Sequence, residues 1–484
     1  MEDYTLKRPG VQEKATGFGK KAGCLLPDAC CLYNRLCGLG IRLSEGNRLL
    51  DRRAGLEQEY FLVEESGRPS KRADEFLEVC QAMTEAESGS AACFAPEFVL
   101  GLVEVNTPPV YNLSDLEREF TRNLEMALRT ASTLELRLYP LGTYPLPLRP
   151  VARDGLDYRV QVGTVGPERF VDAGRCAGTH LHLELQPGTV DATAAISATA
   201  STAAREEALN LYNLATALDP ALISLTRSCP FFEGRATGLA VRTVHYRGHA
   251  LFGWEGVYTE LPQVGALLPY AEDSDHLIRQ QFDRYEAWLT AMDRAGVERR
   301  YFAEAGGDLL RPAWNPVRLN RQGTLELRGM DSNHPEVTLT AAAMILGTAE
   351  RVRNEGLRVV PDKGVRTFEV AGDVLRVPDF DLLNGGLLHA AVTGGVNDET
   401  VAAYMDSILD FAGEDERLIE LRRHRLATGV YPTTEAAILE DYDGAHLFEE
   451  EGLRLVLEAC DELKAQVSRL SRSQPQEEEP ADVS

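Results

Sequence analysis

Residues 179–187 read T-H-L-H-L-E-L-Q-P and carry the clearest strand pattern of the chain. Polar and apolar side chains alternate in this stretch, and successive side chains of a β-strand point to opposite faces. His180, His182 and Glu184 therefore share one face, while leucines occupy the other. The pattern predicts a strand that packs its leucines on a core and gathers two imidazoles and a carboxylate on the opposite face.

Further strands are predicted in three other stretches, with long helical patterns between them. The strands are 55–64 (G-L-E-Q-E-Y-F-L-V-E), 98–107 (F-V-L-G-L-V-E-V-N-T) and 323–331 (G-T-L-E-L-R-G-M-D). The helices are 72–86, a helix opened by a capping box of Ser114 and Glu117 and running to about 136, 189–218, 276–296, 336–353, and most of the chain after Asp362. Both a parallel α/β and an antiparallel α+β arrangement fit this spacing, and the sequence period alone does not decide between them.

The chain is acidic, with a formal net charge of −25 over 484 residues. An acidic surface repels phosphate backbones, so we expect no nucleic-acid partner. No apolar run reaches about 18 residues, and the first residues lack the apolar core of a secretory signal. These features predict a cytoplasmic protein without a membrane partner.

Two of the strands carry pairs of charged residues on one face. Glu57 and Glu59 lie two positions apart, and two carboxylates on one strand face are costly to bury unless they meet a cation. Glu326 and Arg328 have the same spacing, with Asp331 nearby. Such a pair is either a plain ion pair or a metal ligand beside a phosphate clamp, which is the combination that phosphoryl transfer requires.

Two weaker patterns complete the set of candidates. Glu104 and Asn106 alternate in L-V-E-V-N-T-P-P, and Arg235 and Arg242 flank T-G-L-A-V. Taken singly, each of these residues could lie on the surface. Together, four strands present metal-competent residues at period two, and a cup of carboxylates is suited to Mg²⁺ ions that carry nucleotide phosphates. The chain has neither a G-x-x-x-x-G-K-[ST] P-loop nor a G-x-G-x-x-G fingerprint, which weakens the case for other nucleotide-binding folds.

The order of these motifs resembles the second family of glutamate–cysteine ligases, which includes bacterial carboxylate–amine ligases of the glutamine synthetase-like superfamily. The motifs are G-L-E-Q-E-Y-F-L-V-E, L-V-E-V-N-T-P-P, L-G-T-Y-P, G-T-H-L-H-L-E, C-P-F-F-E-G-R-A-T-G and G-T-L-E-L-R-G-M-D, and they span roughly residues 52–355. The resemblance implies an α+β fold in which a curved, mainly antiparallel sheet forms a funnel with helices packed outside. It also implies ATP and Mg²⁺, or Mn²⁺, at that funnel.

The resemblance further implies a role for each candidate residue. Arg328 and His182 are the expected catalytic residues, with Arg328 stabilising the transferring phosphoryl group. His180, Arg242 and Arg235 are expected to bind the nucleotide. The expected metal ligands are Glu57, Glu59, Glu104 and Glu326.

Composition at the two ends and the extent of the resemblance together divide the chain. Residues 1–50 are expected to form an N-terminal extension, 51–360 the catalytic core, 361–472 a helical C-terminal part packed on the core, and 473–484 a disordered acidic tail. The chain has nine cysteines, an odd number, and four of them cluster near the start without a paired C-x-x-C signature: Cys24, Cys30, Cys31 and Cys37. We expect reduced thiols here and no metal cluster.

The expected reaction joins a carboxylate to an amine in two steps through an acyl phosphate. Glutamate with cysteine is the leading substrate pair, glutamate with another amine is the second, and a homo-oligomer is compatible with either. Two alternatives remain open. One is a metal-dependent oxygenase or hydrolase built on His180, His182 and Glu184, because two histidines and a carboxylate suit non-haem iron. The other is a non-catalytic protein that binds ATP or amino acids.

Overall fold

The computed structural model describes residues 50–88 and 93–473 of the chain. These residues belong to one compact unit, Leu49–Ser484. The N-terminal extension, the four clustered cysteines and the acidic tail lie outside the described residues, apart from residues 50 and 473. The expected division of the chain at residue 360 stays a prediction.

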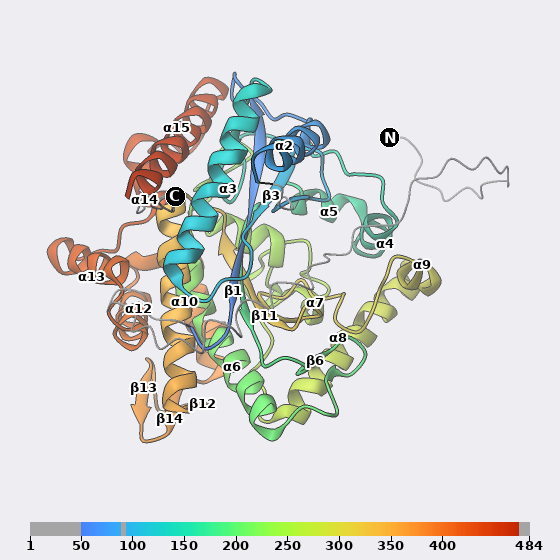
Figure 1. The fold of residues 1–484 in the computed structure, drawn as a ribbon, viewed down its shortest axis with the longest axis vertical. Helices are drawn as coiled ribbons and strands as arrows, with labels where there is room; N and C mark the ends of the chain where they lie inside the picture. Colours follow the sequence, from blue (N-terminus) through green and yellow to red (C-terminus); the bar gives the residue numbers. More distant parts are fainter. Residues whose placement is uncertain (1–49, 89–92, 474–484) are drawn as a thin grey trace, which may run out of the picture. The chain divides into compact units, whose positions relative to one another are not determined.

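Seven strands form the main sheet, and every pairing within it is antiparallel. Six strands follow the order β10-β11-β5-β1-β3-β2, and β4 pairs with the far end of β1. Their bounds are β1 Ala54–Glu64, β2 Phe94–Pro96, β3 Leu102–Asn106, β4 Leu136–Tyr139, β5 Gly178–Glu184, β10 Val317–Asn320 and β11 Thr324–Asp331. Of the two arrangements left open by the sequence, the antiparallel one is therefore correct for this sheet, and the mixed α+β class is confirmed (Figure 1). The funnel shape stays a prediction.

One face of the sheet is apolar because the period-two patterns place leucines and other large side chains there. Leu56, Leu181 and Leu327 come from three neighbouring strands and belong to the same buried core. Burying a leucine side chain stabilises a fold by about 1.5–3 kcal/mol. The alternation in the sequence therefore fixes which face of each strand turns inward.

Long helices cover this apolar face. They are α2 Ala73–Ser88, α3 Leu113–Thr133, α6 Thr202–Thr226 and α10 Pro335–Glu355. In α3, apolar residues recur every three or four positions, so Leu116, Phe120 and Leu124 fall on one side and are fully buried. Their side chains pack with those of the sheet into one large core.

The other face of the sheet meets a second group of helices, α4 Leu156–Val165, α5 Pro167–Ala173, α7 Pro262–Gly265, α8 Ser274–Arg294 and α9 Arg299–Glu304. Figure 1 shows α4, α5, α8 and α9 on the opposite side of β1 from α3 and α10. These helices share a smaller aromatic core of their own, with Phe170, Trp288 and Phe302 among its members. The polar face of the sheet is thus the one that this second helical group covers.

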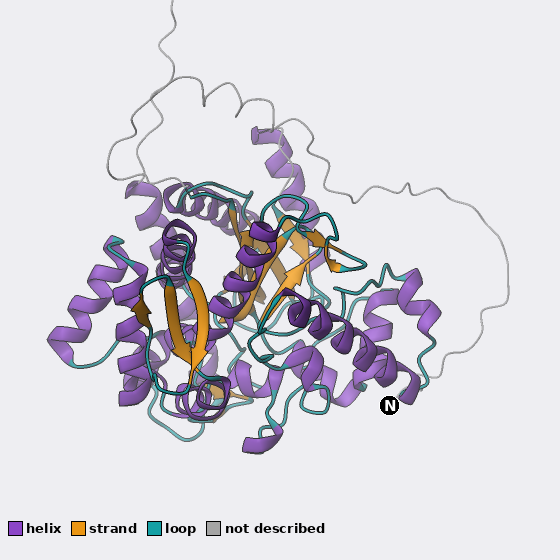
Figure 2. Ribbon diagram, turned by 90° about the horizontal axis from the view of Figure 1, so that it is seen from below, coloured by secondary structure: helices purple, strands orange, loops and turns teal. Residues whose placement is uncertain are grey.

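The remaining elements are short strands and the C-terminal helices. The short strands are β6 Val190–Asp191, β7 Ala195–Ile196, β8 Phe231–Phe232, β9 Arg235–Ala236, β12 Arg358–Asp362, β13 Glu369–Ala371 and β14 Val374–Pro378. The helices are α11 Leu388–Thr393, α12 Glu399–Ala412, α13 Glu416–Thr428, α14 Thr434–Asp441 and α15 Glu449–Ser473, with π-helical turns η1 Thr243–Arg247 and η3 Leu382–Leu387 and 3₁₀ turns η2 Ala250–Phe252 and η4 Gly395–Asn397. Strands β12, β13 and β14 form a separate small sheet, in the foreground of Figure 2, in which β12 and β14 run parallel. No helix in the described part of the chain is both long and apolar enough to cross a membrane.

Two helix starts differ from the sequence-based expectation. The predicted capping box at Ser114 is wrong. The cap of α3 is Asn112, two residues earlier, whose side chain accepts a hydrogen bond from the Asp115 N–H at 2.6 Å. Residues 189–201 are not helical. They form the β6–β7 hairpin, since the Asp191 carboxylate accepts from the backbone N–H groups of the turn, and α6 begins only after Ser201.

Two strand boundaries also differ from the expectation. Residues 98–101 lie in a turn, so β3 is half the expected length and begins at Leu102. The chain after Asp362 first forms β13 and β14 before the expected helices start.

Candidate active site

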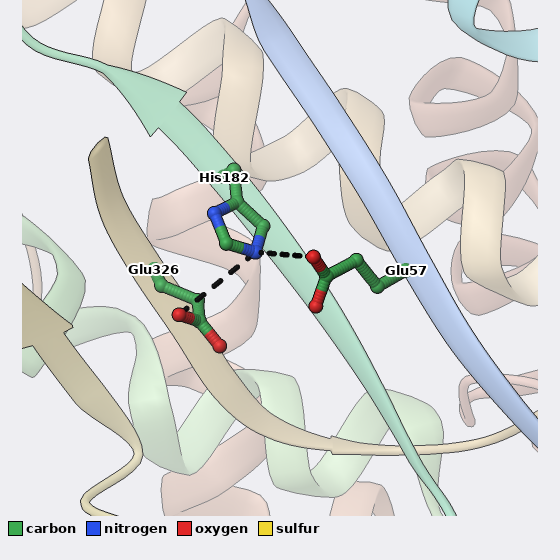
Figure 3. Close-up of side chains that lie close together, drawn as sticks. All are labelled: Glu57, His182 and Glu326. Carbon is green, nitrogen blue, oxygen red and sulfur yellow. Dashed lines mark ion pairs between the residues drawn. The ribbon is translucent and has the colours of Figure 1, made fainter. Parts of the chain in front are cut away.

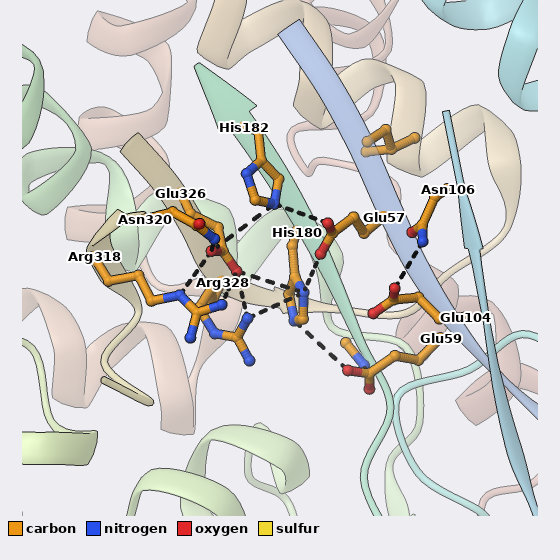
Figure 4. Close-up of polar contacts among 12 residues, drawn as sticks. Glu57, Glu59, Glu104, Asn106, His180, His182, Arg318, Asn320, Glu326 and Arg328 are labelled. Atoms are coloured by element: carbon orange, nitrogen blue, oxygen red, sulfur yellow. Dashed lines mark hydrogen bonds and ion pairs between the residues drawn. The ribbon is translucent and has the colours of Figure 1, made fainter. Parts of the chain in front are cut away.

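The polar face of the sheet opens into a cavity of about 380 Å³. Five strands, β1, β3, β5, β10 and β11, contribute side chains to its wall (Figure 4). Of the residues expected in the site, the cavity is lined by Glu57, Glu59, Glu104, His180, Arg242 and Arg328. Glu326 and His182 are buried beside them.

Strand register explains why these side chains meet. Glu57 is the partner of His180 across β1 and β5, and His182 is the partner of Glu326 across β5 and β11. Residues that face each other in an antiparallel pair project to the same side of the sheet, about 4.5–5.5 Å apart at Cβ. Because these register pairs lie on neighbouring strands, a carboxylate, two imidazoles and a second carboxylate form a continuous row.

His182 lies between two carboxylates (Figure 3). Its Nε2 atom is 3.2 Å from Glu57 Oε1 and 3.9 Å from Glu326 Oε2. Its Nδ1 atom is 2.9 Å from the Thr324 hydroxyl, whereas Nε2 has no partner in hydrogen-bond geometry within residues 50–88 and 93–473. A histidine that binds a metal through one ring nitrogen usually bonds a second group through the other, and His182 has this arrangement.

His180 lies deeper in the same row. Its Nδ1 atom is 3.4 Å from Glu57 Oε2 and 3.3 Å from Arg328 Nη1, and its Nε2 atom is 3.7 Å from Glu59 Oε1. Burial and the neighbouring Arg328 charge lower the pKa of His180, so its ring is held neutral and able to offer a lone pair. Its Nε2 atom also lacks a hydrogen-bond partner in the described part of the chain.

Three carboxylates cluster at the other end of the cavity. Glu59 and Glu104 are register partners across β1 and β3, and Glu97 joins them from the end of β2. Burial, together with the neighbouring carboxylates, raises the pKa of Glu104 to about 8 and raises the pKa of Glu97 well above its usual range. Sequence analysis missed Glu97, because β2 is only three residues long and Glu97 follows it without any period-two signal.

These groups fit a divalent cation. Three overlapping sets each place one ligand atom per residue within 4.8 Å of the others: Glu57, His182 and Glu326; Glu57, Glu104 and His180; and Glu59, Glu97 and Glu104. Buried carboxylates that raise one another's pKa are stabilised by a cation among them, and hard oxygen-rich sets suit Mg²⁺ or Mn²⁺. The two imidazole Nε2 atoms, which have no hydrogen-bond partner among the described residues, could offer nitrogen ligands to the same row.

Glu326 also organises two arginines. Its carboxylate accepts a two-pronged hydrogen bond from Arg318 at 2.7 and 3.0 Å, one from Asn320 at 2.6 Å, and a short one from Arg328. Although burial alone would raise the pKa of Glu326, the two guanidinium groups hold it well below its usual range. Glu326 therefore faces His182 on one side and orients Arg328 toward the cavity on the other.

Arg318 and Asn320 were not recognised from the sequence. Their signal was available, because V-R-L-N at 317–320 alternates and leads through Gln322 and Gly323 into the strand that carries Glu326. That geometry is a β-hairpin whose two strands present polar side chains to the same face.

Arg242 reaches the cavity from the start of η1. Its guanidinium stacks on Tyr246 at 5.3 Å and donates to the Arg328 carbonyl at 3.3 Å, and its Nε has no hydrogen-bond partner in the part of the chain that the structure describes. It lies against Gly178, where a Cβ atom would stand 2.8 Å from Arg242 Cζ. Only glycine at 178 leaves room for this arginine.

Two candidates lie away from the cavity. Arg235 is exposed on β9 and lines a different hollow of about 500 Å³ beside His446 and Leu447. Glu184 stands at the end of β5, where its carboxylate accepts from Arg53 Nε at 3.0 Å, and it belongs to none of the candidate metal-binding sets of the described residues. The expected nucleotide-binding role of Arg235 and an iron site containing Glu184 therefore have no geometric support.

A glycine next to Arg328 should be needed for stability. Gly329 lies where the β11–β5 register shifts, and a Cβ atom there would stand 2.5 Å from Arg247 Nη2 and closer still to the Asp219 carboxylate, which form a buried ion pair. We expect Gly329→Ala to destabilise the fold by about 2–4 kcal/mol through overpacking, measured by urea unfolding. Gly385→Ala, whose Cβ would meet nothing within 4 Å, is the matched control, and equal effects of the two changes would contradict the packing argument.

Two solved structures have a fold similar to that of this chain. The fold is similar to that of a bifunctional glutathione synthetase from Pasteurella multocida (TM-score 0.52, 16% identity, 87% of this chain and 54% of that chain covered). It is also similar to that of a glutamate–cysteine ligase from Francisella tularensis in complex with AMP (TM-score 0.53, 12% identity, 87% of this chain and 92% of that chain covered). At these identities the likeness concerns the fold.

Sequence comparison identifies the family. Residues 53–379 match glutamate-cysteine ligase family 2 (GCS2), and the chain belongs to this family. Over 284 residues the chain is 26% identical to the protein named "Putative glutamate--cysteine ligase 2" from Ectopseudomonas mendocina (strain ymp). The match covers 57% of this chain and 61% of that relative.

Proposed function

We propose that the protein is an ATP-dependent carboxylate–amine ligase that uses Mg²⁺ or Mn²⁺, with glutamate and cysteine as the leading substrates. The observation that carries the proposal is the convergence of carboxylates and two histidines from β1, β3, β5 and β11 on one cavity, beside Arg328 and Arg242. Family membership supports the same class of reaction.

The site resolves an electrostatic problem that such a reaction faces. A substrate carboxylate and a triphosphate are both anions, and they repel each other at bonding distance. Bound divalent cations would screen that repulsion and polarise the γ-phosphate. Glu57, His182 and Glu326 on one side, and Glu59, Glu97 and Glu104 on the other, would hold them.

In the first step a carboxylate oxygen of the acid substrate forms a bond to the γ-phosphorus, the bond between that phosphorus and the β–γ bridging oxygen breaks, and ADP leaves. Negative charge builds up on the transferring phosphoryl oxygens. Arg328 would stabilise this charge, because Glu326 fixes its guanidinium at the cavity wall. Arg242, which also lines the cavity, has an unpaired N–H donor for an anionic substrate group.

In the second step the amine nitrogen attacks the acyl carbon, the bond from that carbon to the phosphate oxygen breaks, and inorganic phosphate leaves. The amine gives up a proton as the amide forms. The same cavity offers an aromatic wall for the amine substrate, formed by Tyr158, Trp288, Phe302 and Trp314. An ion pair of Asp157 and Arg311, 3.3 Å apart, lies in the same wall.

The proposal predicts ADP release that depends on both an amino-acid pair and Mg²⁺ or Mn²⁺. We expect the protein to release ADP and phosphate in equal amounts with glutamate and cysteine, and mass spectrometry to detect the γ-glutamyl amide. Omitting the amine should leave no more than slow turnover. A folded protein that released no ADP with any amino-acid pair in excess Mg²⁺ would contradict the proposal and favour a non-catalytic binding protein.

A further inference from the structure

A buried polar network outside the cavity lies on the opposite face of β1. Gln58, between Glu57 and Glu59, is fully buried on this face. Its Nε2 donates to the backbone carbonyl of Asn333 at 2.6 Å, and its Oε1 accepts from the Thr338 hydroxyl at 2.8 Å. A buried amide with both ends bonded fixes the position of its strand, since leaving either end unpaired is costly.

The segment that receives Gln58 joins two parts of the candidate site. Residues 331–334 run from the end of β11, the strand of Glu326 and Arg328, to the start of α10. Within it, the Ser332 hydroxyl lies 2.8 Å from the carbonyl oxygens of both Glu59 and Gly178. We call residues 331–334 the clamp segment, because it bonds to β1 and β5 and continues from β11.

The C-terminal helices hold the clamp segment from outside. The Thr434 hydroxyl, at the start of α14, donates to Asn333 Oδ1 at 2.6 Å, and Asn333 Nδ2 donates to the Thr226 carbonyl at 2.9 Å. The next residue, Glu435, forms a buried ion pair with Arg227 at the end of α6. Thr434 and Glu435 lie beyond residues 53–379, the part of the chain that matches the family.

We infer that Thr434 is a positioning residue for the candidate metal ligands, acting through Asn333 and Gln58 on Glu57 and Glu59. The inference rests on the proposed function for its chemical meaning. Physically it follows from burial, because Asn333 and Gln58 have no solvent to replace a lost partner. The Asn333 side chain bonds Thr434, while its backbone carbonyl accepts from Gln58. Without the Thr434 hydroxyl, Asn333 Oδ1 keeps only the His334 N–H as a donor, so Asn333 shifts and its backbone passes the change to Gln58. A helical part outside the matched family region would thereby set the spacing of two carboxylates on the catalytic sheet.

The test compares two neighbouring threonines. Thr434→Val removes the hydroxyl that holds Asn333 and keeps the side-chain shape. Thr433→Val is the matched control, because Thr433 caps the same helix by accepting from the Ala436 N–H at 3.2 Å and makes no side-chain hydrogen bond to the clamp segment among the described residues. Mn²⁺ alone, without nucleotide or substrate, is titrated and the free ion is followed by electron paramagnetic resonance.

We expect Thr434→Val to weaken Mn²⁺ binding by about tenfold, the low end of losses seen when groups supporting metal ligands are removed. Thr433→Val should change Mn²⁺ affinity by less than about twofold. The two variants should lower the melting temperature by similar amounts, since each loses one hydrogen bond. Gln58→Leu should also weaken binding, and adding Thr434→Val to it should cost little more, because both changes act on one chain of bonds.

Equal effects of the two threonine variants, or full additivity of Thr434→Val with Gln58→Leu, would overturn the inference. Hydrogen exchange of the peptide covering 54–64 provides a second readout that needs no metal. Exchange should quicken in Thr434→Val and not in Thr433→Val. If the wild type binds no Mn²⁺, this comparison alone tests the inference, and equal exchange in the two variants would overturn it. A protein that bound Mn²⁺ as expected but released no ADP would overturn the proposed function and leave this inference standing.

Discussion

Glu326→Gln should lower the rate of ADP release by about 10²-fold or more, the scale of losing one electrostatic stabiliser in an active site. The change keeps the shape of the side chain but removes the charge that holds Arg318 and Arg328 and faces His182. An amide has only one acceptor oxygen, so the two-pronged hydrogen bond from Arg318 cannot form in the variant.

The same substitution should also lower stability, because two partly buried guanidinium groups lose their counter-charge. Activity is therefore measured per folded molecule, well below the melting temperature of the variant. Glu184→Gln is the matched control, since it breaks an arginine–carboxylate contact on the neighbouring strand, outside the cavity. We expect it to stay within about twofold of wild type, a change far below that of losing a catalytic group.

Two outcomes would contradict this account. Normal turnover by folded Glu326→Gln would make Glu326 a purely structural residue. Loss of ADP release in Glu184→Gln with normal release in Glu326→Gln would instead place the metal site on His180, His182 and Glu184.

Glu57→Gln should weaken the apparent affinities for Mg²⁺ and ATP together, by about 10–100-fold, the range found when metal-site groups are altered. Glu57 is shared by two of the three candidate metal-binding sets, with His182 and Glu326 in one and His180 and Glu104 in the other. Although burial alone would raise the pKa of Glu57, the two histidines hold it well below its usual range, so the side chain is an ionised ligand at neutral pH. The joint effect is expected because each Mg²⁺ would bind both protein carboxylates and phosphates.

The measurement is a titration of metal and of ATP for wild type, Glu57→Gln and His182→Ala. Glu64→Gln is the control, because it makes the same change at the far end of β1, where Glu64 lines no part of the cavity. If Glu57→Gln titrated like wild type while His182→Ala lost a tightly held iron or zinc, the metal would belong to the histidine strand alone. That result would contradict the ligase proposal.

The sequence predicted the chemistry of individual strands well, because period two is a local property. Glu57 and Glu59 on β1, His180 and His182 on β5, and Glu326 and Arg328 on β11 were each assigned to a shared face, and each pair is found on the cavity side of its strand. Helices were placed less accurately at their starts, since a single hydrogen-bonding side chain such as Asn112 or Ser201 decides where a helix begins.

Residues without a periodic signal could not be assigned to the site from the sequence. Glu97 joins the carboxylate cluster only because β2 pairs with β3 and brings the following residue over the cavity. Arg235 looked equivalent to Arg242 in the sequence, yet the chain between them turns, so Arg242 enters the cavity and Arg235 faces another hollow. A linear motif records which residue types are close in the chain and leaves their direction after a turn undetermined.

By itself, the sequence determined the inward and outward faces of the strands, the residue types of the candidate site and the family to which the chain belongs, because burial pattern and motif order are written along the chain. Only the tertiary structure decided the antiparallel order of the strands, the register that pairs Glu57 with His180 and His182 with Glu326, and the link from Thr434 to Gln58. Those features depend on contacts between residues far apart in the chain, up to 280 positions for Gln58 and Thr338. Such contacts are selected by the packing of the whole unit, and a local pattern carries no record of them.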